Sequence, residues 1–244
     1  MPQGLLPDGD LPDREGLQEM IFQGVSRLCQ SDRGIEAIIA HRMESVVSLL
    51  AAYVLEIELH NPAFGLVGTT DRQGLVARHI LDSLSPLGII ADRVAGHKAA
   101  GPHIADVGSG AGLPGIPLAI AMPDARFSLI ERKGRRAGFL RNTLEVLGLR
   151  NVTVEEEEME KAMAKRFALV TFRAFRPLDP RIHKKLSRLC AKGGVLAAYK
   201  GRLAKARAEM AALEQAVPFL AGRWELLPCP VPGLDEERHL LTVW

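Results

Sequence analysis

The chain has 244 residues, of which 47% are hydrophobic, and its 31 Lys and Arg nearly balance 29 Asp and Glu, a composition typical of a globular protein. No segment approaches the roughly 20 uninterrupted apolar residues that cross a bilayer, and the acidic, proline-rich start is unlike a secretory signal. Cys29, Cys190 and Cys229 lack metal-binding spacing. We therefore expect a cytoplasmic protein with free thiols, no metal site and no membrane span.

Charge is distributed unevenly along the chain. Residues 1–60 hold 4 Lys and Arg against 10 Asp and Glu, whereas residues 132–207 hold 20 against 7. Such a concentration of positive charge favours a polyanionic partner such as nucleic acid, although solvated helix faces produce the same pattern.

The first part of the chain predicts helices. Residues 1–12 are rich in Pro, Gly and Asp, which predicts a disordered tail. Apolar residues at helical spacing predict a first helix around 17–28, a long helix from 34 to about 60, and another from 71 to about 87. Residues 13–100 are therefore expected to form an N-terminal helical extension.

The rest of the chain, residues 101–244, alternates strand and helix patterns. The candidate strands are 103–107, 126–131, 151–155, 167–172, 193–199, 222–228 and 238–243. This alternation predicts an α/β fold with a mostly parallel sheet covered on both faces. The loop VPGLDEE is too short for a crossover helix, so the last strand should run antiparallel. Seven strands with an antiparallel last strand are typical of the Rossmann-like class I methyltransferase fold, whose members use S-adenosylmethionine.

A glycine-rich loop, ADVGSGAGLPG at 105–115, follows the first candidate strand. Gly108, Gly110 and Gly112 let a ligand approach the backbone, and N–H groups at the start of the next helix are expected to be free for it. Gly110, Gly112 and Gly115, with an acid, Glu131, downstream, also match the dinucleotide fingerprint, so two cofactors compete.

Asp106 favours S-adenosylmethionine over a dinucleotide. A carboxylate just before the loop can bind the ammonium group of S-adenosylmethionine, but it would repel the pyrophosphate of NAD. Glu131 suits either cofactor, because both carry ribose hydroxyls. Leu113 belongs to the same loop and is included in the expected cofactor site.

Further segments occur in a specific order. They are ARHILDSLSPL at 77–87, ERKGRRAGFLR at 131–141, TFRAF at 171–175, AYKGR at 198–202 and LDEERHLL at 234–241. With the glycine loop, they make roughly residues 45–243 resemble the bacterial small-subunit ribosomal RNA guanine-N7 methyltransferase family. Two departures from the family pattern are Gly65-Leu66-Val67, where the family usually has Asn-Leu-Thr, and Arg132 in place of a serine.

The resemblance implies methyl transfer from S-adenosylmethionine to N7 of a guanine in 16S ribosomal RNA. The partner would be that RNA or a small-subunit particle, bound by a monomer. The N7 lone pair is free at neutral pH, so no general base is needed and positioning is the main requirement. Two alternatives remain: an NAD-dependent oxidoreductase that uses the glycine loop, and a non-catalytic RNA-binding module in ribosome assembly.

The expected site residues follow from sheet-edge geometry and from the resemblance. Arg173, after the fourth strand, is a candidate catalytic residue that also borders the cofactor, and Lys200, after the fifth, is a catalytic and substrate anchor. The resemblance places Met159 and Glu160 at the adenine. Other candidates for substrate contact are His79, Asp82, Arg135, Arg136 and Arg202. His79 and Asp82 share a helix face, where they flank the active cleft or form a structural pair.

Overall fold

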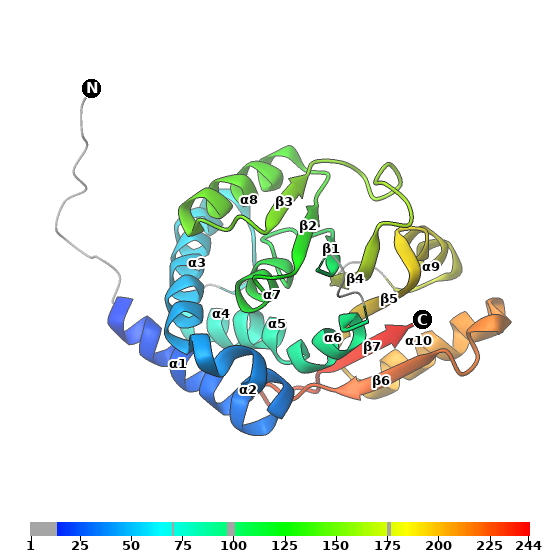
Figure 1. The fold of residues 1–244 in the computed structure, drawn as a ribbon, viewed down its shortest axis with the longest axis horizontal. Coiled ribbons are helices and arrows are strands. Elements are labelled where there is room, and N and C mark those ends of the chain that lie inside the picture. The colour runs from blue at the N-terminus through cyan, green and yellow to red at the C-terminus, as the bar shows by residue number, and fades with distance from the viewer. Residues whose placement is uncertain (1–13, 70, 97–100, 175–176) are drawn as a thin grey trace.

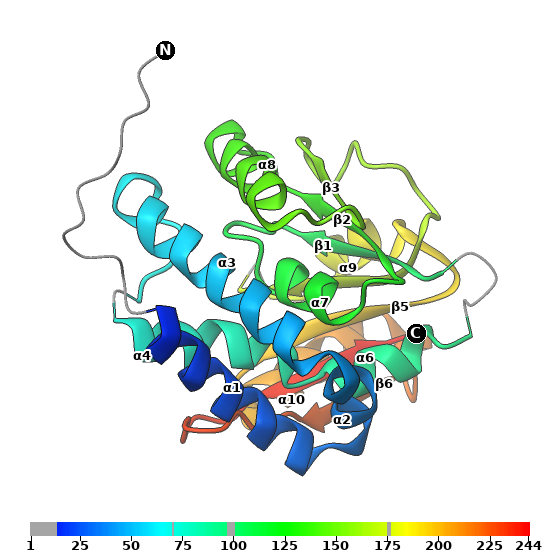
Figure 2. The same cartoon turned by 60° about the vertical axis from the view of Figure 1, so that its left-hand side comes forward.

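A seven-stranded sheet runs through the centre of the structure, with helices on both faces (Figures 1 and 2). The computed structural model describes residues 14–69, 71–96, 101–174 and 177–244. The expected tail at 1–12 and residues 97–100 of the expected extension lie outside this range. The strands are β1 His103–Val107, β2 Arg126–Ile130, β3 Val152–Glu155, β4 Phe167–Arg173, β5 Cys190–Lys200, β6 Trp224–Pro228 and β7 His239–Val243.

Helices occupy most of the remaining described residues. The α-helices are α1 Arg14–Ser31, α2 Arg33–Ile39, α3 Met43–Phe64, α4 Arg72–Leu75, α5 Asp82–Leu84, α6 Leu87–Val94, α7 Gly115–Ala121, α8 Gly134–Leu147, α9 Pro180–Ser187 and α10 Leu203–Ala216. Two 3₁₀ turns, η1 Ala40–Arg42 and η4 Pro218–Leu220, and a π-helical segment, η2 Val76–Leu81, complete them.

The sheet has the strand order β3-β2-β1-β4-β5-β7-β6. β1 to β5 pair in parallel, and β7 lies antiparallel between β5 and β6. The predicted α/β fold with an antiparallel last strand is therefore confirmed. All seven predicted strands are present, and β5 differs most, because it begins at Cys190.

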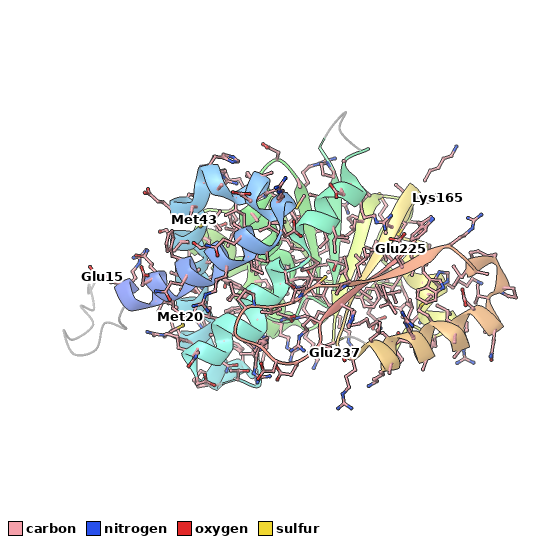
Figure 3. The ribbon with its side chains drawn as sticks, turned by 90° about the horizontal axis from the view of Figure 1, so that it is seen from below. Glu15, Met20, Met43, Lys165, Glu225 and Glu237 are labelled. Atoms are coloured by element: carbon pink, nitrogen blue, oxygen red, sulfur yellow. The ribbon has the colours of Figure 1, made fainter. Side chains whose placement is uncertain are left out.

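Two apolar cores lie on the two faces of the sheet. On one face, the N-terminal helices pack together with α7 and α8 against residues such as Ile104 and Phe127. On the other face, α9 and α10 bury Ile182 and Met210 against the sheet. The N-terminal helices lie at one end of the molecule and α10 at the other, as Figure 3 shows. The helical extension shares a core with one face of the sheet, and η2 and α5 contact Arg173 at the carboxyl end of β4.

Two expectations about helices are wrong in detail. The long helix expected from 34 to 60 is broken at η1, where Arg42 has φ −130° and ψ 14° and its guanidinium donates to the carbonyl of Ala121 at 3.4 Å. The helix expected over 71–87 is divided into α4, η2 and α5, and α6 follows. The wide π segment carries Arg78 and His79, and such segments often occur at functional sites.

The segment Arg33–Phe64 is, by length and composition alone, long and apolar enough to cross a membrane. In the fold, however, α3 is a core helix: Val46, Leu50, Tyr53, Val54 and Ile57 are fully buried against the rest of the protein. The buried stripe of α3 therefore belongs to the core of this chain.

Candidate active site at the carboxyl edge of the sheet

The glycine loop between β1 and α7 forms the centre of the site. Gly108, Gly110 and Gly112 have φ values of +72°, +60° and +93°, which side chains strongly disfavour. A Cβ atom on Gly112 would also lie 2.5 Å from Ile116 Cδ1. The glycines are thus required by the backbone. Leu113 is 6% exposed and packs in the core beneath the loop.

Asp106 lies under this loop and is 1% exposed. Its Oδ2 accepts a hydrogen bond from the N–H of Gly115 at 3.0 Å, so the expectation that the start of α7 is free is wrong at this N–H. Its Oδ1 is buried and has no hydrogen-bond partner among the described residues. Burial raises the pKa of Asp106 to about 7, although the Gly115 N–H and the charge of Arg173 oppose the rise.

A cavity of about 350 Å³ opens between the ends of β1, β2 and β3. Gly108, Glu131, Met159 and Glu160 line it. Glu131 is 4% exposed, and its two carboxylate oxygens accept the N–H groups of Gly110 and Lys133 at 3.0 and 2.8 Å. This carboxylate therefore ties the glycine loop to the end of β2.

Met159 is buried and supplies an apolar wall to this cavity. The carboxylate of Glu160 is ion-paired with Lys185 on α9 at 2.6 Å. The structure thus brings the residues expected at the adenine to the rim of the same cavity as Glu131.

Arg173, at the end of β4, is held by residues of the helical extension. Its guanidinium donates to Asp82 Oδ2 at 2.9 Å and to His79 Nδ1 at 3.2 Å. Arg238, which precedes β7, donates to the other Asp82 oxygen at 3.0 Å. Asp82 is buried, so two guanidinium groups share one buried carboxylate. The structure therefore brings His79, Asp82 and Arg173 together and adds Arg238.

His79 is neutral in this cluster. Burial and the charges of Arg173, Arg78 and Arg238 lower the pKa of His79 to about 4. Because an arginine only donates, His79 Nδ1 must be the acceptor and Nε2 must carry the proton. Nε2 then donates to Thr69 Oγ1 at 3.2 Å. The neutral imidazole fixes one edge of the Arg173 guanidinium.

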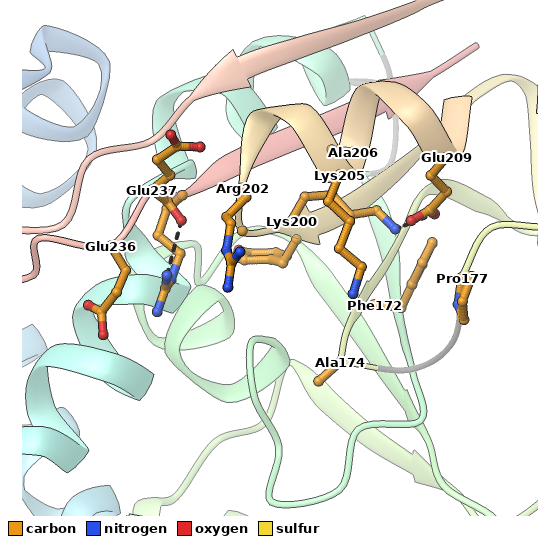
Figure 4. A pocket seen from close by; sticks show the side chains of 13 residues that line it. Phe172, Ala174, Pro177, Lys200, Arg202, Lys205, Ala206, Glu209, Glu236 and Glu237 are labelled. Carbon is orange, nitrogen blue, oxygen red and sulfur yellow. Dashed lines mark hydrogen bonds and ion pairs between the residues drawn. The ribbon is translucent and has the colours of Figure 1, made fainter. Parts of the chain in front are cut away.

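A second cavity, of about 910 Å³, lies between the ends of β4 and β5 and α10 (Figure 4). Lys200 and Arg202 line it, as does Arg238. Lys200 is ion-paired with Glu209 of α10 at 2.5 Å. The sequence predicts Lys200 as a substrate anchor but does not predict this partner. Ala174 lines both this cavity and the smaller one, so the two meet directly after Arg173.

The arginines expected along the RNA track occupy different positions. Arg135 is exposed at the start of α8, and Arg136 lines the smaller cavity and donates to the carbonyl of Gly65 at 3.5 Å. Arg202 is exposed at the start of α10. These groups lie along the carboxyl edge of the sheet.

Three residues of this region were not expected from the sequence. Tyr53, fully buried in α3, donates from its hydroxyl to the carbonyl of Ala111 at 2.7 Å and so anchors the glycine loop. Arg238 and Glu209 are the others. Arg238 belongs to the recognised segment LDEERHLL, which could have indicated it, whereas Tyr53 and Glu209 fall within ordinary amphipathic helix patterns.

The fold and this edge define a class I methyltransferase. The chain matches the model of the family rRNA small subunit methyltransferase G over residues 47–240 and belongs to that family. It is 36% identical to Ribosomal RNA small subunit methyltransferase G of Chromobacterium violaceum over 213 residues, which are 86% of this chain and 94% of that protein. It is 38% identical to the protein of the same name from Stenotrophomonas maltophilia strain K279a over 198 residues, 80% and 84% of the two chains.

Solved structures support the fold at low sequence identity. The human methyltransferase 10 domain containing protein has a TM-score of 0.52 at 13% identity, over 80% of this chain and 97% of that chain. A predicted O-methyltransferase from Agrobacterium tumefaciens has a TM-score of 0.50 at 23% identity, over 68% of this chain and 79% of that chain. These similarities concern the methyltransferase fold alone.

Proposed function

We propose that this protein transfers a methyl group from S-adenosylmethionine to N7 of a guanine in 16S ribosomal RNA. The observation that carries the proposal is that the two cavities share Ala174, the residue after Arg173, and that Gly108 of the glycine loop lines the smaller one. A cofactor in the smaller cavity and a base in the larger one would meet at that junction. Family membership supports both the reaction and the RNA substrate.

The smaller cavity fits the cofactor. Glycine φ values exclude side chains from the loop beside it, and Glu131 offers carboxylate oxygens at the end of β2 for ribose hydroxyls. Met159 provides apolar surface for the adenine. Asp106 does not line this cavity but lies beneath the loop beside it, and its buried Oδ1, unpaired among the described residues, is an acceptor that suits the ammonium group. When bound, S-adenosylmethionine supplies an electrophilic methyl group on a positively charged sulfur.

The residues of the chain contribute positioning. Arg173 is held in one orientation by Asp82 and His79, at the end of β4 and next in the chain to Ala174, which lines both cavities. No side chain needs to remove a proton, because N7 of guanine carries a free lone pair. A fixed guanidinium can orient the base through O6 or a neighbouring phosphate, and orientation is the main source of rate here.

The remaining proposals concern the partner and its setting. Exposed Arg135 and Arg202, with Arg136 beside the cofactor cavity, would contact the phosphates of the RNA or of a small-subunit particle. We infer that the protein acts as a monomer in the cytoplasm.

Calorimetric titration with S-adenosylhomocysteine and NADH, side by side, tests the cofactor assignment. We expect binding of S-adenosylhomocysteine alone, with affinity reduced by Glu131→Gln. Binding of NADH in place of S-adenosylhomocysteine would instead support the oxidoreductase alternative. Methyl incorporation into small-subunit particles separates the enzyme from a non-catalytic binding module.

A further inference from the structure

Within the part of the chain that the structure describes, the hydrogen-bond partners of Glu209 use only one of its two carboxylate oxygens. Oε1 accepts both from Lys200 Nζ, at 2.5 Å, and from the N–H of Leu178, at 2.6 Å. Oε2 has no hydrogen-bond partner among the described residues, and it is not among their buried unpaired atoms. The Glu209 side chain is 14% exposed and lines the larger cavity, so a ligand bound there can reach its carboxylate.

Lys200, beside this carboxylate, has more than one N–H to donate. An ammonium group carries three protons, and one is used by Glu209. The Lys200 side chain is 12% exposed and lines the same cavity. The pair therefore presents a donor next to an acceptor, both held in place, as Figure 4 shows for the end of β5 and α10.

This pattern matches one edge of guanine. O6 of guanine is an acceptor, and N1–H and the N2 amino group beside it are donors. Adenine has the reverse order, with a donor at N6 and an acceptor at N1, so the same pair would face a donor with a donor. Sites that leave polar groups unpaired with the wrong ligand discriminate strongly.

The geometry also leaves the reacting atom free. N7 lies on the same edge of guanine as O6 and away from the N2 amino group. A base bound by Glu209 and Lys200 would therefore leave the N7 lone pair unoccupied, in a cavity that shares Ala174 with the smaller one. Hydrogen bonds from Glu209 and Lys200 to this edge therefore select guanine without blocking methyl transfer to N7.

Resting on the function proposed above, we propose that Glu209 is a specificity-determining residue that accepts hydrogen bonds from N1–H and the N2 amino group of the target guanine, while Lys200 donates to O6. Glu236 and Glu237 are less suited to this role. Glu236 is paired with Arg78 and is 43% exposed, and Glu237 accepts from the N–H of Leu203 at 2.6 Å.

Small-subunit particles provide the test, reconstituted with guanosine or inosine at the nucleotide that the wild-type protein methylates. Inosine keeps N7, O6 and N1–H but lacks the N2 amino group. We expect wild-type kcat/KM to be about 10-fold or more higher for guanosine, as for a charge-assisted hydrogen bond. In Glu209→Gln, Oε1 can keep its two donors, so the amide NH₂ replaces Oε2. The ratio of guanosine to inosine kcat/KM should then fall to one or below, because the amide NH₂ faces the N2 amino group, which only guanosine carries.

Glu145→Gln, which makes the same change at an exposed position on α8, is the matched control and should keep the wild-type preference. Cofactor affinity should be unchanged in both variants. Equal rates of the wild type on guanosine and inosine, or an undiminished preference in Glu209→Gln, would overturn the assignment of Glu209. No methylation of the guanosine particle by the wild type would overturn the proposed function, and with it this assignment.

Discussion

Asp106 should make the stability of the folded protein depend on pH. Its pKa rises from 3.8 to about 7 on folding, chiefly through burial. A shift of about 3 units, at about 1.4 kcal/mol each, corresponds to a cost of about 4 kcal/mol for keeping the folded carboxylate ionised. The folded state holds this proton where the unfolded state has lost it, so stability falls as pH rises toward 7. The cost is complete above that pH.

Substitution of Asp106 by Asn should remove this cost. Between about pH 5.5 and about pH 8.5, wild type should lose about 2 kcal/mol of unfolding free energy relative to the variant. The unfolding free energies of the two proteins are compared at each pH. This is needed because His79 and His103, whose pKa values are lowered to about 4, make the unfolding free energy of both proteins rise with pH. Urea unfolding followed by circular dichroism measures it, and exposed Asp124→Asn is the matched control.

The same group should link pH to cofactor binding. If Asp106 pairs with the cofactor ammonium, its proton must leave on binding, so affinity for S-adenosylhomocysteine should increase up to about tenfold per unit as pH rises from about 5.5 to 7. Asp106→Asn should lose that dependence and bind more weakly by about 1.5 to 3 kcal/mol. Identical pH profiles for wild type and Asp106→Asn, in unfolding and in binding, would refute this reasoning.

Three other sets of substitutions test the site. Arg173→Ala and Lys200→Ala should each slow single-turnover methylation of small-subunit particles far more than they lower folding stability. Only Arg173→Ala should also weaken cofactor binding. Wild-type turnover in both variants would exclude Arg173 and Lys200 from the active site. Removing Arg135 and Arg136 together should flatten the salt dependence of RNA binding, since fewer counterions are released, and an unaltered slope places the RNA elsewhere. Gly112→Ala should destabilise the protein and abolish cofactor binding, because φ is +93° and Cβ would meet Ile116; a cofactor titration and a thermal melt check it.

Most of the sheet could be predicted from the sequence, because strands leave a local signal. β1 and β2 are buried on both faces and occur as apolar runs between turns, and the short loop before β7 excludes a crossover. The breaks in the helices had no such signal. The η1 turn coincides with a contact between Arg42 and Ala121, which lie 79 residues apart, and sequence periodicity does not contain that contact.

The candidate site could likewise be predicted only in part from the sequence. The recognised segments indicated His79, Asp82 and Arg173, and the structure brings them into contact across more than 90 residues of chain. They did not indicate that Asp106 would take the N–H of Gly115, or that Glu209 would pair with Lys200, because these depend on how the loop and α10 pack. Side-chain partners within a buried cluster are decided by tertiary structure.

Methyl transfer to N7 of one guanine can be tested directly. The most direct measurement incubates the purified protein with S-adenosylmethionine and small-subunit particles that lack the modification, followed by mass spectrometry of the nucleosides from their 16S ribosomal RNA. We expect N7-methylguanosine at close to one per particle, at a single position, and none with Arg173→Ala on the same time scale. Absence of methyl incorporation, or a methyl group on any other atom, would contradict this expectation.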